Sequence, residues 1–253
     1  MKYLSVELLK ISKSIESKIS YLFTIVMVFI IIISFKMGDT SGVSNIDSVF
    51  LTLGNFNRYI MIYFVMILMT SLVVANEFNY GTYRYLMMRP VSLKQLLINK
   101  YIALWIFAGI ILLLTSIVSF LVGTTLFGTG VLHGENQIEL SQPLLRFIIF
   151  YIGTWINTFF IIQLTTYISI LLKNNINTIV VTFSAIFVVL FLTRFVSDSI
   201  LDFTPINYIT LKPYIFNASI DWSHIIFGIL ITQIYGAFFS FLSLAKLKRE
   251  DVG

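Results

Sequence analysis

Six long runs of apolar residues, separated by short polar segments, dominate the pattern along the chain. They cover about residues 19–35, 59–75, 101–123, 147–172, 176–196 and 225–245. Each run is near or above the ~20 residues with which a helix crosses a hydrocarbon core of ~30 Å. Strands of a membrane barrel would be shorter and would alternate between apolar and polar residues. The pattern therefore predicts an all-α integral membrane protein with six transmembrane helices.

The first run is expected to be a retained helix and not a cleaved signal peptide, because the sequence KMGDTSG after it lacks a small-residue cleavage pattern. We find no internal repeat and no low-complexity linker in the chain. Residues 19–253 are therefore interpreted as a single membrane domain.

The segment before the first run has its own helical pattern. Its apolar residues at helical spacing are Leu4, Leu8, Ile11 and Ile15. The polar residues that lie largely on the other face are Glu7, Lys10, Lys13 and Ser14. This pattern predicts an amphipathic helix over residues 1–18 that lies along the inner membrane surface. The alternative is a plain anchor that only sets the topology.

Composition supports the membrane interpretation. Hydrophobic residues make up 58% of the 253 residues and charged residues only 11%, whereas a soluble domain has about 25% charged residues. The chain has no cysteine, so no disulfide or thiolate chemistry is expected. Neither of its two histidines, His133 and His224, has a nearby partner at metal-ligand spacing. No metal site or cofactor is expected in this chain.

The distribution of Lys and Arg predicts the orientation. With both termini in the cytoplasm, twelve of the 17 basic residues fall in inner segments, which agrees with the positive-inside rule. The net charge of +5 is attributed to this topology, and no nucleic-acid partner is expected. The Ile-, Lys- and Asn-rich usage is typical of an AT-rich bacterial genome. The expected location is the bacterial plasma membrane.

The longest basic interruption reads NEFNYGTYRYLMMRPVSLKQLLINK and lies between the second and third runs. Gly81 can take positive φ and end the second span, and Thr82 can cap a short new helix. Pro90 disfavours helical geometry at Arg89 and ends that helix. The segment is therefore predicted to project from the membrane as a bracket with a short helix at its tip.

After the proline, the sequence predicts the start of the third spanning helix. Ser92 and Gln95 form a capping-box pattern, and Val91 and Leu96 are placed as a hydrophobic staple. The tip before it is rich in Tyr, Met and Arg, which are enriched at protein interfaces. Docking of a partner protein and simple contact with anionic lipid are both open on this architecture.

The motif N-E-F-N-Y-G-T-Y-R, followed by L-x-x-R-P-V-S and KQLLINK before a span, resembles the type-2 family of ABC exporter permeases. The resemblance covers essentially the whole chain. It implies an amphipathic N-terminal helix, six spans, a cytoplasmic coupling helix between spans 2 and 3, and re-entrant outer helices before span 6. It also implies that a P-loop ATPase subunit contacts the segment. The residues that would contact it are Glu77, Gly81, Thr82, Tyr83, Arg84, Tyr85 and Arg89.

The chain lacks the sequence of an ATP site of the P-loop kind. The motif G-x-x-x-x-G-K-[ST], whose backbone amides cradle phosphates, does not occur. The chain is therefore not expected to be an enzyme by itself. ATP and Mg²⁺ would be bound by the partner ATPase subunit.

Amide side chains within the spans are candidates for a substrate path. They are Asn157 and Gln163 in the fourth run and Gln233 in the sixth. The alternative is that these amides only link helices, with modest energies of ~0.6 kcal/mol. The sixth run also has small residues at every fourth position from Gly228 to Ser240, which favour close packing of helices within the subunit or between two subunits.

The segment from residue 197 to residue 223 is too apolar for a freely solvated loop. It contains two prolines, Pro205 and Pro213, among aromatic and aliphatic residues. Re-entrant helices that cap the outer exit fit this composition. An ordinary interfacial loop with an aromatic belt is the alternative.

These observations favour the permease subunit of an ATP-driven exporter that works with a second permease subunit, identical or not. The expected cargo is an amphipathic or hydrophobic substrate. A peptide such as a toxin or antimicrobial peptide is favoured, as in exporters that resemble those for antimicrobial-peptide immunity or phenol-soluble modulins. Drug or sodium export is an alternative cargo. A non-transporting membrane scaffold or sensor is the alternative function, whereas an intramembrane protease lacks its constellation of catalytic residues.

Overall fold

The computed structural model of the chain describes residues 2–37, 44–58, 61–79, 92–130, 142–208, 211–217 and 219–251, which are helical or connecting segments without a β-strand. The elements are α1 (Lys2–Lys13), α2 (Ile15–Met37), α3 (Asn45–Arg58), α4 (Met61–Asn79), α6 (Leu93–Phe127), α7 (Pro143–Leu172), α8 (Asn175–Leu192), η2 (Thr193–Phe195), α9 (Asp198–Leu201), η3 (Pro205–Tyr208), α10 (Lys212–Ile215) and α11 (Trp222–Asp251).

The six predicted apolar runs correspond to six helices that are long and apolar enough to cross a membrane. These helices are α2, α4, α6, α7, α8 and α11. Most extend beyond the predicted bounds, because the helical hydrogen-bond pattern continues into polar residues that hydropathy alone leaves out. The chain is a helical multi-pass membrane protein, as the sequence predicts.

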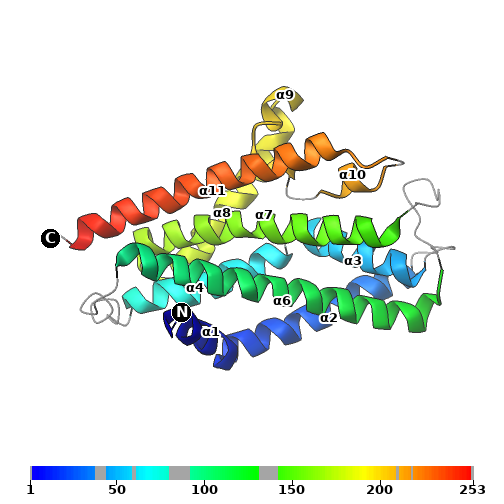
Figure 1. Cartoon of the computed structure of the whole chain (residues 1–253), viewed down its shortest axis with the longest axis horizontal. Helices are drawn as coiled ribbons and strands as arrows, with labels where there is room; N and C mark the ends of the chain where they lie inside the picture. Colours follow the sequence, from blue (N-terminus) through cyan, green and yellow to red (C-terminus); the bar gives the residue numbers. More distant parts are fainter. Residues whose placement is uncertain are drawn as a thin grey trace.

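Figure 1 shows the long helices side by side along the long axis of the molecule. Both chain termini and the connection between α7 and α8 lie toward one end, which we call the terminal end. Helices α3 and α10 lie toward the opposite end, which we call the loop end (Figure 1). The last turn of α4 and the first turn of α6 are also at the terminal end (Figure 1).

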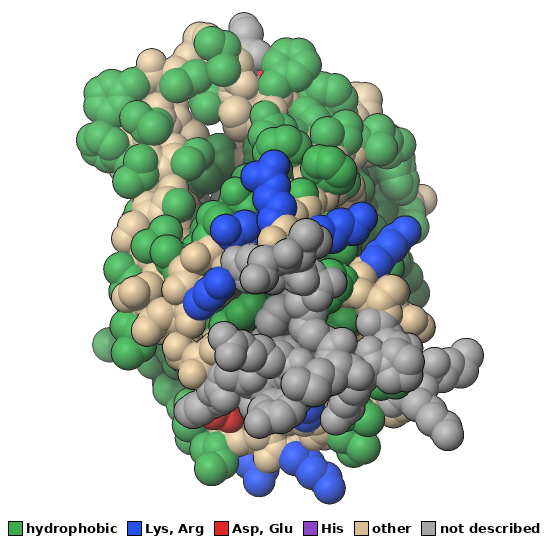
Figure 2. All heavy atoms as spheres, turned by 90° about the vertical axis from the view of Figure 1, so that its left-hand side faces the viewer, with side chains coloured by type: hydrophobic (Ala, Val, Ile, Leu, Met, Phe, Trp, Pro, Cys, Tyr) green, Lys and Arg blue, Asp and Glu red, His purple; other side chains and the backbone are tan. Residues whose placement is uncertain are grey.

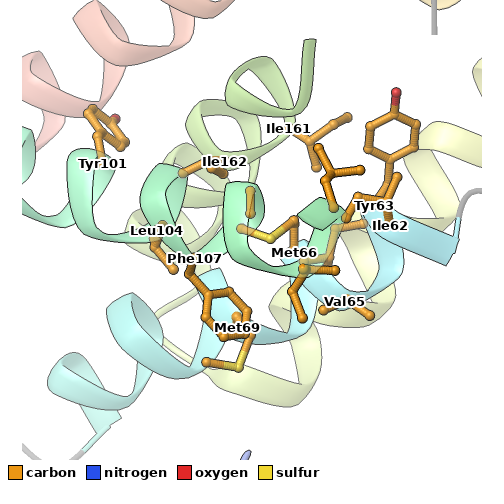
Figure 3. Close-up of a cluster of buried hydrophobic side chains, with 14 of the residues drawn as sticks. Ile62, Tyr63, Val65, Met66, Met69, Tyr101, Leu104, Phe107, Ile161 and Ile162 are labelled. Carbon is orange, nitrogen blue, oxygen red and sulfur yellow. The ribbon is translucent and has the colours of Figure 1, made fainter. Parts of the chain in front are cut away.

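Helix α4 is the centre of the packing. More than half of its apolar window, 56%, is buried, against 17% for α8 and 28% for α2 and α11. Figure 3 shows α4 side chains such as Met66 and Met69 beside Phe107 of α6 and Ile162 of α7. In a bilayer, the exposed apolar faces of α2, α8 and α11 contact lipid or another membrane protein.

A pair of tryptophans joins α6 to α7. The rings of Trp105 and Trp155 stack with centroids 4.3 Å apart. Each indole N–H donates to the backbone carbonyl of the other residue, at 3.1 Å from Trp105 and 2.8 Å from Trp155. Gly109 lies under the Trp155 ring, where an added Cβ would be 3.0 Å from its Nε1. The glycine therefore permits the close approach of the two helices.

The N-terminal helix is shorter than predicted, and residues of both its apolar and its polar face are buried. It ends at Lys13 and not at residue 18, and α2 begins at Ile15. Ser14 marks the break because its Oγ accepts a hydrogen bond from the N–H of Ser17, at 3.1 Å, as a helix cap does. The predicted apolar face packs partly on the bundle, where Ile11 is buried, and Glu7 of the predicted polar face is buried as well.

Helix α3 is not among the elements that the sequence analysis predicts. Its start is a capping box in which Ser44 Oγ accepts from the N–H of Asp47 and Asp47 Oδ2 accepts from the N–H of Ser44. Val49, Phe50 and Leu53 are buried along one face. The S-x-x-D pattern and this helical spacing are the sequence signals that would have identified the helix.

The predicted start of the third spanning helix is confirmed. Ser92 is the N-cap of α6, and its side chain accepts a hydrogen bond from the N–H of Gln95 at 3.3 Å. The proposed partner of the hydrophobic staple, Val91, lies outside the described residues.

Candidate functional site: a buried charge cluster at the terminal end

Four charged side chains from three helices meet at the terminal end, close to the last turn of α4 and the start of α6. Glu7 and Lys10 come from α1, Glu77 from the last turn of α4, and Lys100 from the early part of α6. We call these four residues the charge cluster. The side chain of Lys100 is only 2% exposed, and those of Glu77 and Glu7 are 13% and 11% exposed.

Lys100 is the centre of the charge cluster. Its Nζ lies 2.7 Å from Glu77 Oε1 and 3.3 Å from Glu7 Oε2, and it donates to the carbonyl oxygen of Val73 at 3.3 Å. These contacts use the three donors of an ammonium group. Lys10 lies on the more exposed side, with its Nζ 3.3 Å from Glu7 Oε1 and 3.4 Å from Glu77 Oε1.

The charge cluster is neutral overall, with two carboxylates and two ammonium groups. Burial by itself would lower the pKa of Lys10, but the charges of Glu7 and Glu77 outweigh it and raise that pKa above its ordinary value. Lys10 therefore stays protonated at physiological pH. Its stabilising contribution is fully present below the unfolded pKa of about 10.5 and is lost only as the pH rises through the folded pKa.

The local sequence explains how the charge cluster forms. Glu7 and Lys10 are three residues apart on one face of α1, and Val73 and Glu77 are four apart on one face of α4. A cavity of about 200 Å³ lies beside the cluster between α1 and α4. The cluster thus ties the N-terminal helix to both helices that flank residues 80–91.

The predicted docking residues are described only in part. Glu77 is placed by the structure, and it pairs with cations of its own chain. Gly81, Thr82, Tyr83, Arg84, Tyr85 and Arg89, and with them the predicted coupling helix, lie outside the described residues. The sequence analysis did not identify Glu7, Lys10 and Lys100 as members of the site. The signal that could have identified them is a lysine at the edge of one apolar run, together with glutamates at the edges of two other helical segments.

The terminal end is basic around this site. Figure 2 views that end directly and shows Lys and Arg side chains gathered on it, with few acidic ones. Exposed cations of the described segments at this end include Lys94, Lys173, Lys248 and Arg249. Such a distribution is typical of the cytoplasmic side of a membrane protein.

The three candidate path residues all lie between α7 and neighbouring elements. Asn157 donates from Nδ2 to the Tyr208 carbonyl at 2.7 Å and accepts from Thr232 Oγ1 at 3.0 Å. Gln233 donates from Nε2 to the Ile156 carbonyl at 3.0 Å. Gln163 is buried, and its Oε1 has no hydrogen-bond partner among the residues that the structure describes. Two of the three amides therefore link helices, and none of the three lines the cavity beside the charge cluster.

The small-residue stripe of α11 packs within the subunit. An added Cβ at Gly228 would lie 2.3 Å from Tyr208 Cδ1, and one at Gly236 would lie 1.9 Å from Gln163 Oε1. Thr232, between them, bonds to Asn157. The first of the two alternatives for the stripe, packing inside one subunit, is therefore observed.

A buried cation was also missed at the loop end. Arg146 of α7 is 2% exposed, and its Nη1 donates to the backbone carbonyls of Ile215 and Asn217, the latter at 3.0 Å. It holds the chain after α10 against the bundle. The predicted apolar character of this region is confirmed by the buried Tyr208, Leu211 and Ile215. The region forms short helices, whereas a re-entrant course through the membrane stays a prediction.

Comparison with known proteins identifies a family for most of the chain and one relative for a shorter stretch. Residues 48–253 match the family described as "Protein of unknown function (DUF2705)". A 74-residue stretch is 43% identical to the "Uncharacterized protein YhcI" of Bacillus subtilis (strain 168), covering 29% of this chain. The match spans 23% of that relative's length. No solved structure matches the chain.

Proposed function

The chain belongs to the DUF2705 family, whose function is unknown. For this chain we propose the function of the permease subunit of an ATP-driven exporter. The observation that carries the proposal is the charge cluster. It joins α1, α4 and α6 at the point where residues 80–91 connect α4 to α6. A force applied to that segment would reach three helices together.

In this proposal, residues 82–89 form a coupling helix that docks on a separate P-loop ATPase subunit. ATP binding with Mg²⁺ on that subunit moves the segment, and the charge cluster carries the movement into α4 and α6. Helix α4 is the most buried span and packs against α6, α7 and α8. A displacement of its end would therefore shift the packing of the whole bundle.

The proposal includes a second permease subunit. Helices α2, α8 and α11 are the spans with the least burial, and α8 has only three buried residues, Thr178, Thr182 and Ile186. A second subunit, identical or not, would pack against one of these faces. The membrane lipid covers the others.

The cargo in this proposal is an amphipathic or hydrophobic molecule, with a toxin or antimicrobial peptide favoured. The support is the exposed apolar surface of the spans, which an amphiphile dissolved in the bilayer can contact. Where they are described, the spans have no buried carboxylate at mid-depth, so a pathway that binds cations through such groups has no support.

The experiment that tests the proposal is purification of the tagged full chain from its native membrane in mild detergent, with identification of the co-purified proteins. Recovery of a P-loop ATPase is expected, together with its loss when residues 82–89 are replaced by a Gly/Ser linker. Absence of an ATPase, under conditions that preserve a control ABC complex, would contradict the exporter function and favour a scaffold or sensor.

A charge reversal gives a sharper form of this test. Arg89→Glu is expected to abolish ATPase recovery and export while the protein stays in the membrane, because a docking cation becomes an anion. Lys248→Glu, which reverses an exposed cation at the same end, is the matched control and is expected to retain both. Glu77→Lys is a poorer test, because it would place a third cation beside Lys10 and Lys100 and disturb folding.

A further inference from the structure

A groove at the loop end has walls from three helices. It lies between α3, the later half of α6 and the start of α7, and its volume is about 500 Å³. Ligand sites in proteins commonly have volumes of about 300–1,000 Å³. Aromatic side chains of all three helices line it, namely Phe50, Phe120 and Phe147.

The groove lies within the part of the protein that spans the membrane. Its α6 wall runs from Leu113 to Leu121, inside the span Leu93–Phe127 and toward the loop end. Eight residues of helix rise by about 12 Å, so the groove extends along a substantial part of one leaflet. Leu113, Ile117 and Leu121 are 48%, 56% and 58% exposed. The medium that faces this opening is therefore hydrocarbon.

The wall formed by α3 is held in place by specific contacts. The N–H of Asn45 donates to the Gly128 carbonyl at 3.0 Å, and Ser48 Oγ donates to the Ser119 carbonyl at 3.2 Å. An added Cβ at Gly123 would lie 1.9 Å from Ser48 Oγ. The start of α3 is thus fastened to the end of α6, and the groove is part of the folded architecture.

The chemistry of the lining determines what can occupy the groove. Ser116 is the one polar residue among those that line it, and its hydroxyl already donates to the Leu112 carbonyl at 2.9 Å. An extended peptide in the groove would leave its N–H and C=O groups unpaired, which costs several kcal/mol per group in an apolar medium. The occupant must therefore have no unpaired polar group along its buried length.

We propose that the groove between α3, α6 and α7 binds one acyl chain of a phospholipid from the leaflet at the loop end. An acyl chain has no polar group that needs a partner, is present in the bilayer at this depth, and matches the apolar lining that the three helices supply. This inference does not depend on the proposed export function. It predicts a lipid that exchanges more slowly than the lipid around the exposed faces of α2 and α8.

The test uses the full chain in vesicles of phosphatidylethanolamine and phosphatidylglycerol that contain a trace of phospholipid with a diazirine midway along one acyl chain. After illumination, mass spectrometry locates the adducts. Several-fold more adducts are expected on α3, residues 113–121 and the start of α7 than on the exposed residues of α2 and α8. Equal adduct density on all exposed apolar faces would overturn the proposal.

A matched pair of variants tests the groove directly. Ile117→Trp fills it, whereas Ile110→Trp enlarges an exposed α6 residue outside the groove, with a comparable exposure of 45%. A several-fold loss of groove adducts is expected only for Ile117→Trp, and Leu121→Trp is the second filling variant. Unchanged adducts in both filling variants would overturn the proposal.

A photoreactive residue at Leu144, on the rim of the groove, identifies the occupant in native membranes. A lipid adduct is expected. A cross-link to a second copy of the chain or to another polypeptide would overturn the proposal and make the groove a protein interface.

Discussion

Lys100 shows how one residue can join distant parts of the chain. It belongs by sequence to the start of an apolar run, and it pairs with Glu77 on α4 and with Glu7 on α1. Removing one partner from a buried ion pair costs about 3–5 kcal/mol because an uncompensated charge stays behind, whereas replacing the whole group by apolar or neutral residues can cost little. The charge cluster therefore specifies an arrangement of helices more than it adds stability.

Lys100→Met is expected to lower the free energy of unfolding by about 3–5 kcal/mol, because it removes the buried ammonium group that both carboxylates contact. Thermal and denaturant unfolding of the purified protein in detergent measures this loss. Lys94→Met, at an exposed position of the same helix, is the control and is expected to have little effect. The double variant Lys100→Met, Glu77→Gln is expected to recover part of the loss. An equal loss in both lysine variants would contradict the role of the charge cluster.

Among the elements, the close contacts of α11 with η3 and with α7 are possible because two of its residues are glycines. Gly228 faces the rigid ring of Tyr208, and Gly236 faces the flexible end of Gln163. The hydrogen bonds from Thr232 to Asn157 and from Gln233 to Ile156 lie between these positions. The polar residues that are candidates for a path therefore contribute to a packed interface in this structure.

Gly228→Ala is expected to destabilise the protein by about 1–3 kcal/mol, the usual cost of overpacking, because its Cβ would lie 2.3 Å from Tyr208 Cδ1 and 3.0 Å from Tyr208 Cβ. Gly236→Ala is expected to cost less, because Gln163 can turn its amide away. Unfolding in detergent compares the two variants. If Gly236→Ala costs as much as Gly228→Ala, the flexible side chain does not relieve the contact.

At the scale of the whole molecule, the two ends of the bundle differ in charge and in construction. The terminal end has the charge cluster and the surrounding cations (Figure 2). The loop end has α3, the short helices before α11 and the apolar groove (Figure 1). With the positive-inside rule, this difference predicts that the terminal end faces the cytoplasm.

The chain has no cysteine, so single cysteines can report the orientation without background. Ser219→Cys, between α10 and α11, is expected to react with a membrane-impermeant maleimide in intact cells. Lys248→Cys, near the C-terminal end of α11, is expected to react only after permeabilisation, because the cytoplasmic side is not accessible from outside. The reverse result would invert the proposed topology.

The helical class, the six spans and the start of α6 could be predicted from the sequence alone. These features depend on residues close together in the chain: twenty or so consecutive apolar residues predict a span, and Ser92 caps the helix three residues before Gln95. The predicted coupling helix rests on the same kind of local signal, and it stays a prediction because residues 82–89 lie outside the described residues.

Which of these elements contact one another is visible only in the tertiary structure. It brought Glu7 to Lys100 across 93 positions of sequence, placed Arg146 against carbonyls at and just after the end of α10, and set α3 beside α6 to form the groove. Hydropathy could not reveal these contacts, because a pattern along the chain reports the surroundings of each residue but not its partner. The partner depends on how long helices pack, and that packing is a property of the whole bundle.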